Sequence, residues 1–324
     1  MFVSLIAYSC IQETQSPNSN SNVYLAGAIE NSNRTTIASY WKNGDYFPLT
    51  DGSEASEVNC MAVTSSDIWI GGWDWTLLPN TGVVWKNGKE ILPGTFGEVP
   101  TIAAQGSDFY STYIDVSNGK WFYTKNGIAN AITDTALNIE PTGMSLQGND
   151  VYISGSSSYD PAPTELNKLI EQHAEYWKNG TLIFREHARD TRALAIYVNQ
   201  NNVYLCGFQQ QDTSSINACY WKNGELIPLP SRNHNAIAFS IFVSGADVYI
   251  AGQDDFKAVY WKNGVAIPLT DGTSMSSANS IFVKGTDVHI GGHENYYPAY
   301  WKNNVKQSIT NQDLPGQIKS VIVQ

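Results

Sequence analysis

Four short stretches of the sequence set aromatic rings beside carboxylates and amides, a combination that suits ligand binding. They read Gly72-Trp73-Asp74-Trp75, Phe208-Gln209-Gln210-Gln211-Asp212, Gln253-Asp254-Asp255-Phe256 and His293-Glu294-Asn295-Tyr296-Tyr297. Such rings stack on the C–H faces of sugars while the polar groups take hydroxyls. They equally suit a peptide or protein partner, and the alternative is that they pack against neighbouring loops. The predicted contacts are Trp73, Trp75, Phe208, Phe256, Tyr296 and Tyr297, with Asp74, Asp254 and Glu294 as polar partners.

A second candidate site is a cluster of cations. Arg185, Arg189 and Arg192 are three of only five arginines in the chain. Guanidinium groups bind carboxylates and phosphates through paired N–H donors, so an anion site is one interpretation. The other is internal pairing with acids close by in the sequence, namely Glu165, Glu171, Glu175 and Asp190. Residues 164–173 also have the composition of two or three helical turns, with Thr164 as the N-cap.

Signatures of catalysis are mostly missing from the sequence. The chain has no nucleophile elbow, no phosphate-binding glycine loop and no Asp-rich calcium loop. His289 and His293 are four residues apart, but on an expected strand and its loop rather than on one helical face. We therefore predict no catalytic residue, no metal site and no cofactor. Carboxylates that act together on a glycosidic bond are recognised only in space, so a hydrolase or lyase acting on polysaccharides is the alternative.

The residues that must position these groups form seven copies of one motif. Its clearest form is Tyr-Trp-Lys-Asn-Gly, as at Tyr40–Gly44, and its anchors lie 39 to 53 residues apart. A period near 40 residues with strand-like units between the anchors is typical of a β-propeller. We therefore predict an all-β, seven-bladed β-propeller with four antiparallel strands, a to d, in each blade.

The turns and the closure of the ring can also be predicted. Asn-Gly between strands c and d is a strong hairpin signal, because both residues of that turn need positive φ. Prolines such as Pro48 and Pro268 place strand d at the outer edge. The first copy starts at strand b, and Ser320–Val323 at the C-terminus matches the a strands of other copies. We expect this C-terminal strand to complete the first blade.

Charged residues of the motif are predicted to be structural. An aspartate opens strand b in most copies and a lysine closes strand c, and these ends lie side by side in an antiparallel pair. We therefore expect a cross-strand ion pair in most blades, with a ring of ligand-binding lysines as the alternative. The aspartates are Asp67, Asp108, Asp150, Asp247 and Asp287.

Three cysteines, Cys60, Cys206 and Cys219, fall in predicted strands. A cross-strand disulfide between Cys206 and Cys219 is one arrangement, and isolated buried thiols are the other. The chain has no Cys-x-x-Cys pair, which disfavours a structural zinc site.

Net charge narrows the range of partners. The formal net charge of the 324 residues is −11. No basic stripe is present, so nucleic acid is not an expected partner, and anionic membrane surfaces are disfavoured. We expect a carbohydrate, peptide or protein partner instead, with a membrane reached only through a lipid anchor.

The N-terminus, residues 1–21, is expected to stand apart from the propeller domain of residues 22–324. Ala7-Tyr8-Ser9-Cys10 is similar to the end of a bacterial lipoprotein signal, with Cys10 as the lipidation site and the polar residues that follow as a tether. The departures are the missing basic region and the short apolar run. The alternative is an N-terminal strand added to the sheet.

The full repeat, Asp-Val-Tyr…Gly…Tyr-Trp-Lys-Asn-Gly, resembles that of seven-bladed propeller lipoproteins of Bacteroidota-type bacteria over roughly residues 22–324. The resemblance implies an exported protein in the periplasm or at the outer membrane and cell surface. It implies no activity. Because only the b–c and d–a loops vary between copies, we expect a non-catalytic binding or scaffolding module whose ligand lies on that face.

Overall fold

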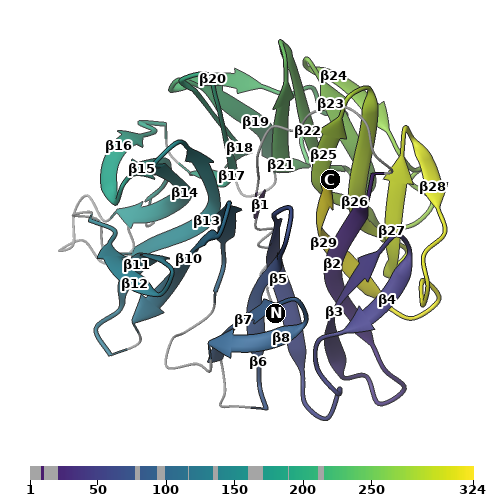
Figure 1. Cartoon of the computed structure of the whole chain (residues 1–324). Coiled ribbons are helices and arrows are strands. Elements are labelled where there is room, and N and C mark those ends of the chain that lie inside the picture. The colour runs from purple at the N-terminus through teal and green to yellow at the C-terminus, as the bar shows by residue number, and fades with distance from the viewer. Residues whose placement is uncertain are drawn as a thin grey trace, which may run out of the picture.

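Seven sheets, each with four antiparallel strands and one with a short parallel strand added, surround a central axis in the computed structural model (Figure 1). The structure describes residues 9–10, 21–76, 81–92, 99–115, 117–133, 138–159, 171–188, 190–210 and 215–324. Each sheet is a blade, with strand a at the axis and strand d at the periphery. The predicted all-β, seven-bladed propeller is confirmed.

The first three blades contain twelve strands. They are β29 (Gly316–Val323), β2 (Val23–Glu30), β3 (Thr36–Lys42) and β4 (Asp45–Pro48) in blade one; β5 (Ser56–Val63), β6 (Ile68–Asp74), β7 (Thr81–Lys86) and β8 (Lys89–Leu92) in blade two; and β9 (Ile102–Gln105), β10 (Asp108–Asp115), β11 (Lys120–Lys125) and β12 (Ile128–Ala131) in blade three.

The remaining blades follow the same order. They are β13 (Asn138–Gln147), β14 (Asp150–Tyr159), β15 (Glu171–Lys178) and β16 (Thr181–Arg185) in blade four; β17 (Thr191–Asn199), β18 (Asn202–Gln210), β19 (Ile216–Lys222) and β20 (Glu225–Pro228) in blade five; β21 (Ala236–Ser244), β22 (Asp247–Asp254), β23 (Lys257–Lys262) and β24 (Val265–Pro268) in blade six; and β25 (Ser276–Lys284), β26 (Asp287–Glu294), β27 (Tyr297–Lys302) and β28 (Val305–Gln307) in blade seven.

The ring closes as the sequence predicts. β29 pairs with β2 from Val23↔Val323 to Ile29↔Gly316, so the C-terminal strand is the inner strand of blade one. Outside this ladder, the backbone groups of Asn22 and Gln324 exchange two further hydrogen bonds. Pairing β2 with β29 in one sheet closes the ring, because β29 covers the edge that β2 would otherwise expose.

The motif residues hold each blade together. The turn residues Asn263 and Gly264 have φ of 50° and 79°, and the Asn263 amide donates to Asp247. Asp247 also pairs with Lys262 at 3.2 Å, and these hydrogen bonds hold its pKa below the ordinary value. The other four predicted aspartates pair in the same way: Asp67–Lys86, Asp108–Lys125, Asp150–Lys178 and Asp287–Lys302. The structural interpretation of these lysines is confirmed.

The core lies between the blades. The strand-c tryptophans are almost fully buried: Trp41, Trp85, Trp177, Trp221, Trp261 and Trp301. Rings of this size contribute most of the apolar area that the fold removes from water. The indole N–H of Trp41 donates to the Thr310 carbonyl and that of Trp261 to the Pro230 carbonyl. These bonds fix the d–a loops over the core.

Steric crowding explains why glycine recurs near the end of strand b. In blade six, a bulge between Ala238 and Ser240 shifts the a–b register and presses strand a onto strand b. A Cβ on Gly252 would lie 2.1 Å from the Ile237 carbonyl oxygen, so no larger residue fits without a backbone shift.

Two sequence-based expectations need correction or refinement in blades four and five. Residues 171–173 belong to β15, where Glu171 and Gln172 pair with Tyr159 and Ser158, so the expected helix was wrong there; Thr164 to Ile170 lie outside the described residues. In blade five, Cys206 and Cys219 are free thiols. They pack in different interblade clusters because their side chains point to opposite faces of the sheet, which rules out the disulfide geometry.

The N-terminus contributes one short described strand. β1 (Ser9–Cys10) pairs in parallel with Gly143 and Met144 of β13, as a fifth strand on the axial edge of blade four. It lies near the middle of the ring (Figure 1). This is the arrangement that the alternative interpretation of the N-terminus expected.

Candidate functional site

The b–c turns and the d–a loops lie on one face of the ring, here called the loop-rich face. In four blades, the b–c turn donates a backbone hydrogen bond to the d–a loop that precedes strand a of the same blade. The pairs are Trp75–Ala55, Gln210–Asp190, Asp255–Asn235 and Asn295–Met275, at 2.8 to 3.0 Å. These bonds tie each of these turns to the d–a loop beside it on the same face.

Blade two presents a pair of indoles. The rings of Trp73 and Trp75 lie 5.7 Å apart at 40°, and Trp75 is exposed while Trp73 is half-buried. Asp74, predicted as their polar partner, is buried. Its carboxylate accepts hydrogen bonds from the backbone and the hydroxyl of Thr76, at 2.9 and 2.8 Å. Asp74 therefore holds the turn that presents the indoles.

In blade six, as in blade two, the predicted carboxylate is buried in the turn while the predicted ring is exposed. Asp254 is buried and accepts hydrogen bonds from the Ser231 hydroxyl at 2.8 Å and the Arg232 backbone at 3.2 Å. Phe256 follows Asp255 in a turn where both residues have positive φ, 50° and 67°. This turn directs the Phe256 ring outward, where it is exposed. Asp254 thus fixes a loop, while Phe256 is available for contact.

Blade seven carries the most exposed aromatic turn on this face. Tyr296 and Tyr297 are both exposed, Tyr296 to 62%. Glu294 pairs with Lys306 at 2.7 Å. Glu294, Tyr297 and Lys306 line a hollow of about 460 Å³ together with Ser274, Asn295, Gln312 and Asp313. Lys306 lies on β28 and Asp313 in the loop that follows it, and the sequence pattern selected neither residue.

Backbone hydrogen bonds link the exposed turns of blades six and seven into one row. The Met275–Ser276 segment lies between two turns, because Ser276 donates to the Phe256 carbonyl and Asn295 to the Met275 carbonyl. Gly316 extends the row by donating to the Tyr296 carbonyl. We call the resulting surface the blade 6–7 ridge; its exposed apolar side chains are Phe256, Met275, Tyr296, Tyr297 and Leu314.

Phe208 does not join the ridge. It is half-buried and packs on Leu194 and Phe239. The predicted aromatic set is therefore divided between the Trp73–Trp75 pair in blade two, a packed ring in blade five and the ridge.

The arginine cluster is engaged internally where it is described. Arg185 bonds Glu175, which is fully buried and also accepts from Ser157 at 2.5 Å. Arg192 bonds the Gln172 amide oxygen, and its guanidinium lies 3.8 Å from Glu140. Arg189 lies outside the described residues. The predicted pairing of Arg185 with Glu175 is confirmed. The partners of Arg192 lie 20 or more residues away in the sequence and were not predicted.

Both histidines of blade seven have lowered pKa values. His289 is 3% exposed, and its Nδ1 lies 2.7 Å from the Tyr300 hydroxyl. Burial lowers its pKa to about 4, assisted by Lys302. Burial and Lys319 likewise lower the pKa of His293 to about 4. His289 is an interblade residue, as its place in the repeat indicates.

No group of three His, Cys, Asp or Glu side chains that could hold a metal ion occurs in the described parts of the chain. The described residues also include no helix long and apolar enough to cross a membrane.

Comparison with known proteins finds no matching family model and no match among curated proteins. Among solved structures, the chain is similar to a neuraminidase-like protein from A/bat/Guatemala/164/2009, with 7% identity and a TM-score of 0.44 over 80% of this chain and 86% of that one. It is also similar to the acylaminoacyl peptidase of Pyrococcus horikoshii, with 8% identity and a TM-score of 0.48 over 79% of this chain and 46% of that one. The chain thus spans about half the length of that peptidase.

Proposed function

We propose that this protein is a non-catalytic, carbohydrate-binding propeller of the bacterial cell envelope, and that its ligand binds on the blade 6–7 ridge. One observation carries the proposal. The ridge presents five exposed apolar side chains, three of them aromatic, beside a hollow of about 460 Å³ lined by carboxylate, amide, hydroxyl and ammonium groups. Sugars offer apolar C–H faces together with hydroxyls, so they match this pairing of rings and polar groups.

A glycan array probed with the labelled full chain tests the proposal, followed by calorimetry on any glycan that binds. We expect Tyr296→Ala and Phe256→Ala each to weaken binding by roughly 1–3 kcal/mol, the usual loss at a hot-spot ring. The matched control is Val265→Ala, which removes a side chain of comparable exposure from the peripheral strand β24. The control should bind as tightly as the parent protein.

Two results would contradict this assignment. If the array is negative and a peptide or protein binds through Tyr296, the ridge is a protein interface. If the control loses as much affinity as the ridge variants, the ridge is not the contact surface.

The envelope location rests on the resemblance of the repeat and on the lipoprotein-like Ala7–Cys10 motif. A lipid anchor at Cys10 competes with the pairing of Cys10 in β1. Expression of the native gene with Cys10→Ser tests it. We expect the parent protein in the membrane fraction with acyl chains on Cys10, and the variant in the soluble fraction without them. Equal fractionation of the two proteins would count against a lipid anchor.

The alternative is a hydrolase acting on polysaccharides, and it has one observation in its favour. Two carboxylates, Glu294 and Asp313, line the same hollow, and pairs of carboxylates cleave glycosidic bonds. We rank it second because Glu294 is bound to Lys306, as in a fixed structural pair. Release of reducing ends from a bound glycan, lost in both Glu294→Gln and Asp313→Asn, would reverse the ranking.

A further inference from the structure

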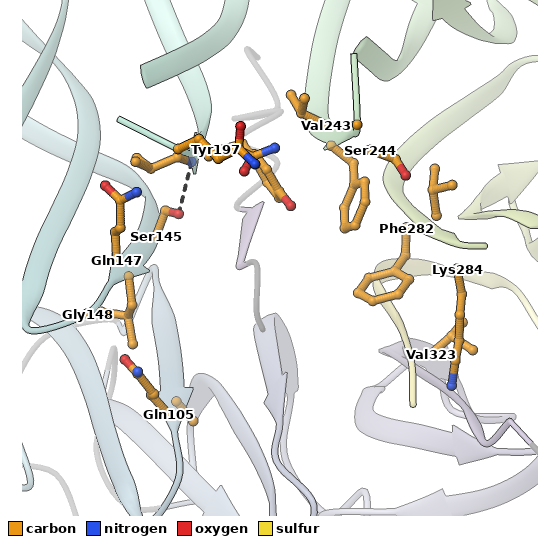
Figure 2. A pocket seen from close by; sticks show the side chains of 18 of the residues that line it. Gln105, Ser145, Gln147, Gly148, Tyr197, Val243, Ser244, Phe282, Lys284 and Val323 are labelled. Carbon is orange, nitrogen blue, oxygen red and sulfur yellow. Dashed lines mark hydrogen bonds between the residues drawn. The ribbon is translucent and has the colours of Figure 1, made fainter. Parts of the chain in front are cut away.

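A larger cavity lies at the opposite end of the ring, on its axis. Its volume is about 690 Å³, and it is lined by the ends of the inner strands where they enter the a–b turns (Figure 2). Small-molecule sites typically measure roughly 300–1,000 Å³. This cavity shares no lining residue with the hollow beside the blade 6–7 ridge, so it is a separate candidate site.

One wall of the cavity is aromatic because three neighbouring blades depart from the rest of the repeat. The position of strand a that pairs with the large residue at the start of strand b is Tyr197, Phe242 and Phe282 in blades five, six and seven. The rings follow one another at 5.0 and 4.9 Å between centroids. In the other blades this position holds Ile322, Ala62, Ala103 and Ser145.

Of the small residues at this position, only Ser145 is among the described lining residues of the cavity. Ala62 and Ala103 pack in the core between blades instead. Ser145 faces the cavity across from Phe282 (Figure 2), and its hydroxyl accepts a hydrogen bond from the Val198 backbone at 3.2 Å.

The rim of the cavity is polar and carries one cation. The strand-a residue next to the turn is Gln105, Gln147 and Ser244 in three blades, and Lys284 in blade seven. Lys284 is the only charged side chain among the described lining residues. Its cross-strand neighbour Asp287 is already bound to Lys302 at 2.7 Å. In a chain with a net charge of −11, this cavity is a local exception that favours an anion.

We propose that the axial cavity binds a small organic acid with a flat apolar ring body. The rings of Tyr197, Phe242 and Phe282 contact the body, Lys284 pairs with the acidic group, and the amides of Gln105 and Gln147 bond its remaining polar atoms. The Tyr197 hydroxyl, a neutral phenol whose pKa burial raises to about 12, donates to the ligand. Long polyanions are excluded, because the rest of the protein repels them.

A fluorescence titration with 8-anilinonaphthalene-1-sulfonate, an aromatic sulfonate, tests the proposal on the full chain. We expect saturable binding of one probe per chain, at least tenfold weaker in Lys284→Glu. The matched control is Lys89→Glu, which makes the same charge change on the peripheral strand β8 and should leave the affinity unchanged. Gln105→Trp, which places a bulky ring at the rim, should abolish binding. Melting temperatures near that of the parent protein show that each variant is folded.

Three outcomes overturn the proposal. The full chain does not bind the probe; Lys89→Glu weakens binding as much as Lys284→Glu; or Tyr296→Ser, on the opposite face, removes the signal while Lys284→Glu does not. The last result would assign the probe to the blade 6–7 ridge. Since glycan binding is measured separately, either proposal can fail without the other.

Discussion

Replacing His289 by tyrosine should make the protein more resistant to mild acid. His289 is buried, and its pKa is lowered to about 4 from an ordinary value of 6.5. Its Nδ1 contacts the Tyr300 hydroxyl, and the charges that influence it are those of Lys302, Asp287 and Lys284. The equivalent residue of strand b is aromatic in every other blade: Tyr24, Trp69, Tyr110, Tyr152, Tyr204 and Tyr249. The repeat therefore accommodates His289→Tyr.

The magnitude follows from linkage between protonation and folding. A group with a lower pKa in the folded state binds fewer protons there, so stability is complete above the unfolded pKa and falls as the pH drops toward the folded pKa. For values of 6.5 and about 4, the loss between pH 7.5 and pH 5 is about 2 kcal/mol. The repeat aspartates, such as Asp247, have lowered pKa values and lose their contribution only below this range. His293 adds a similar loss, since its pKa is also about 4.

Urea denaturation at pH 7.5 and pH 5 measures the effect. We expect the free energy of unfolding of the parent protein to fall by about 4 kcal/mol between the two values, and that of His289→Tyr by about 2 kcal/mol. His293→Gln should remove the other half. An unchanged pH dependence in His289→Tyr, or a His289 pKa near 6.5 measured by NMR, would refute the reasoning.

Three further predictions concern the ring, the indole pair and the thiols. Deleting Gly316–Gln324 removes an inner strand with four nearly fully buried apolar side chains, so roughly 6–12 kcal/mol is lost and the protein should unfold; an unchanged melting temperature would contradict the closure. The double variant Trp73→Ala with Trp75→Ala should stay folded and lose affinity only for ligands that reach blade two; a variant that unfolds would show that the indoles are structural. Cys206 and Cys219 should not react with maleimide in the native protein, because burial raises the pKa of both thiols; labelling of either, mapped by mass spectrometry, would indicate local opening.

The number of blades and the order of their strands follow from the sequence alone. Each Asn-Gly turn, such as Asn263-Gly264, depends only on the positive φ of its own two residues. Each Asp–Lys pair links two strands that follow one another along the chain. Closure by β29 was also predictable, since an orphan strand with the pattern of strand a has only one empty place in the ring. These features are local or repeated, which is why pattern reasoning recovers them.

The candidate site was predictable only in part. The positions of Trp75, Phe256 and Tyr296 on exposed turns followed from their place outside the repeat. The hydrogen bonds that Asp74 and Asp254 make within their own loops could not be predicted. A carboxylate looks the same in the sequence whether it binds a ligand or stabilises a turn. The partners of Arg192 likewise come from β13 and β15, which lie far from it in the sequence.

Tertiary structure decided which residues share a space. Tyr197, Phe242 and Phe282 are about 40 residues apart and look like ordinary core positions in any single repeat. Only closure of the ring brings them side by side along one wall of the axial cavity. The sequence by itself determined each blade, because short-range pairing determines a blade. The ring determined the cavity and the ridge, because both depend on differences between blades that meet only in three dimensions.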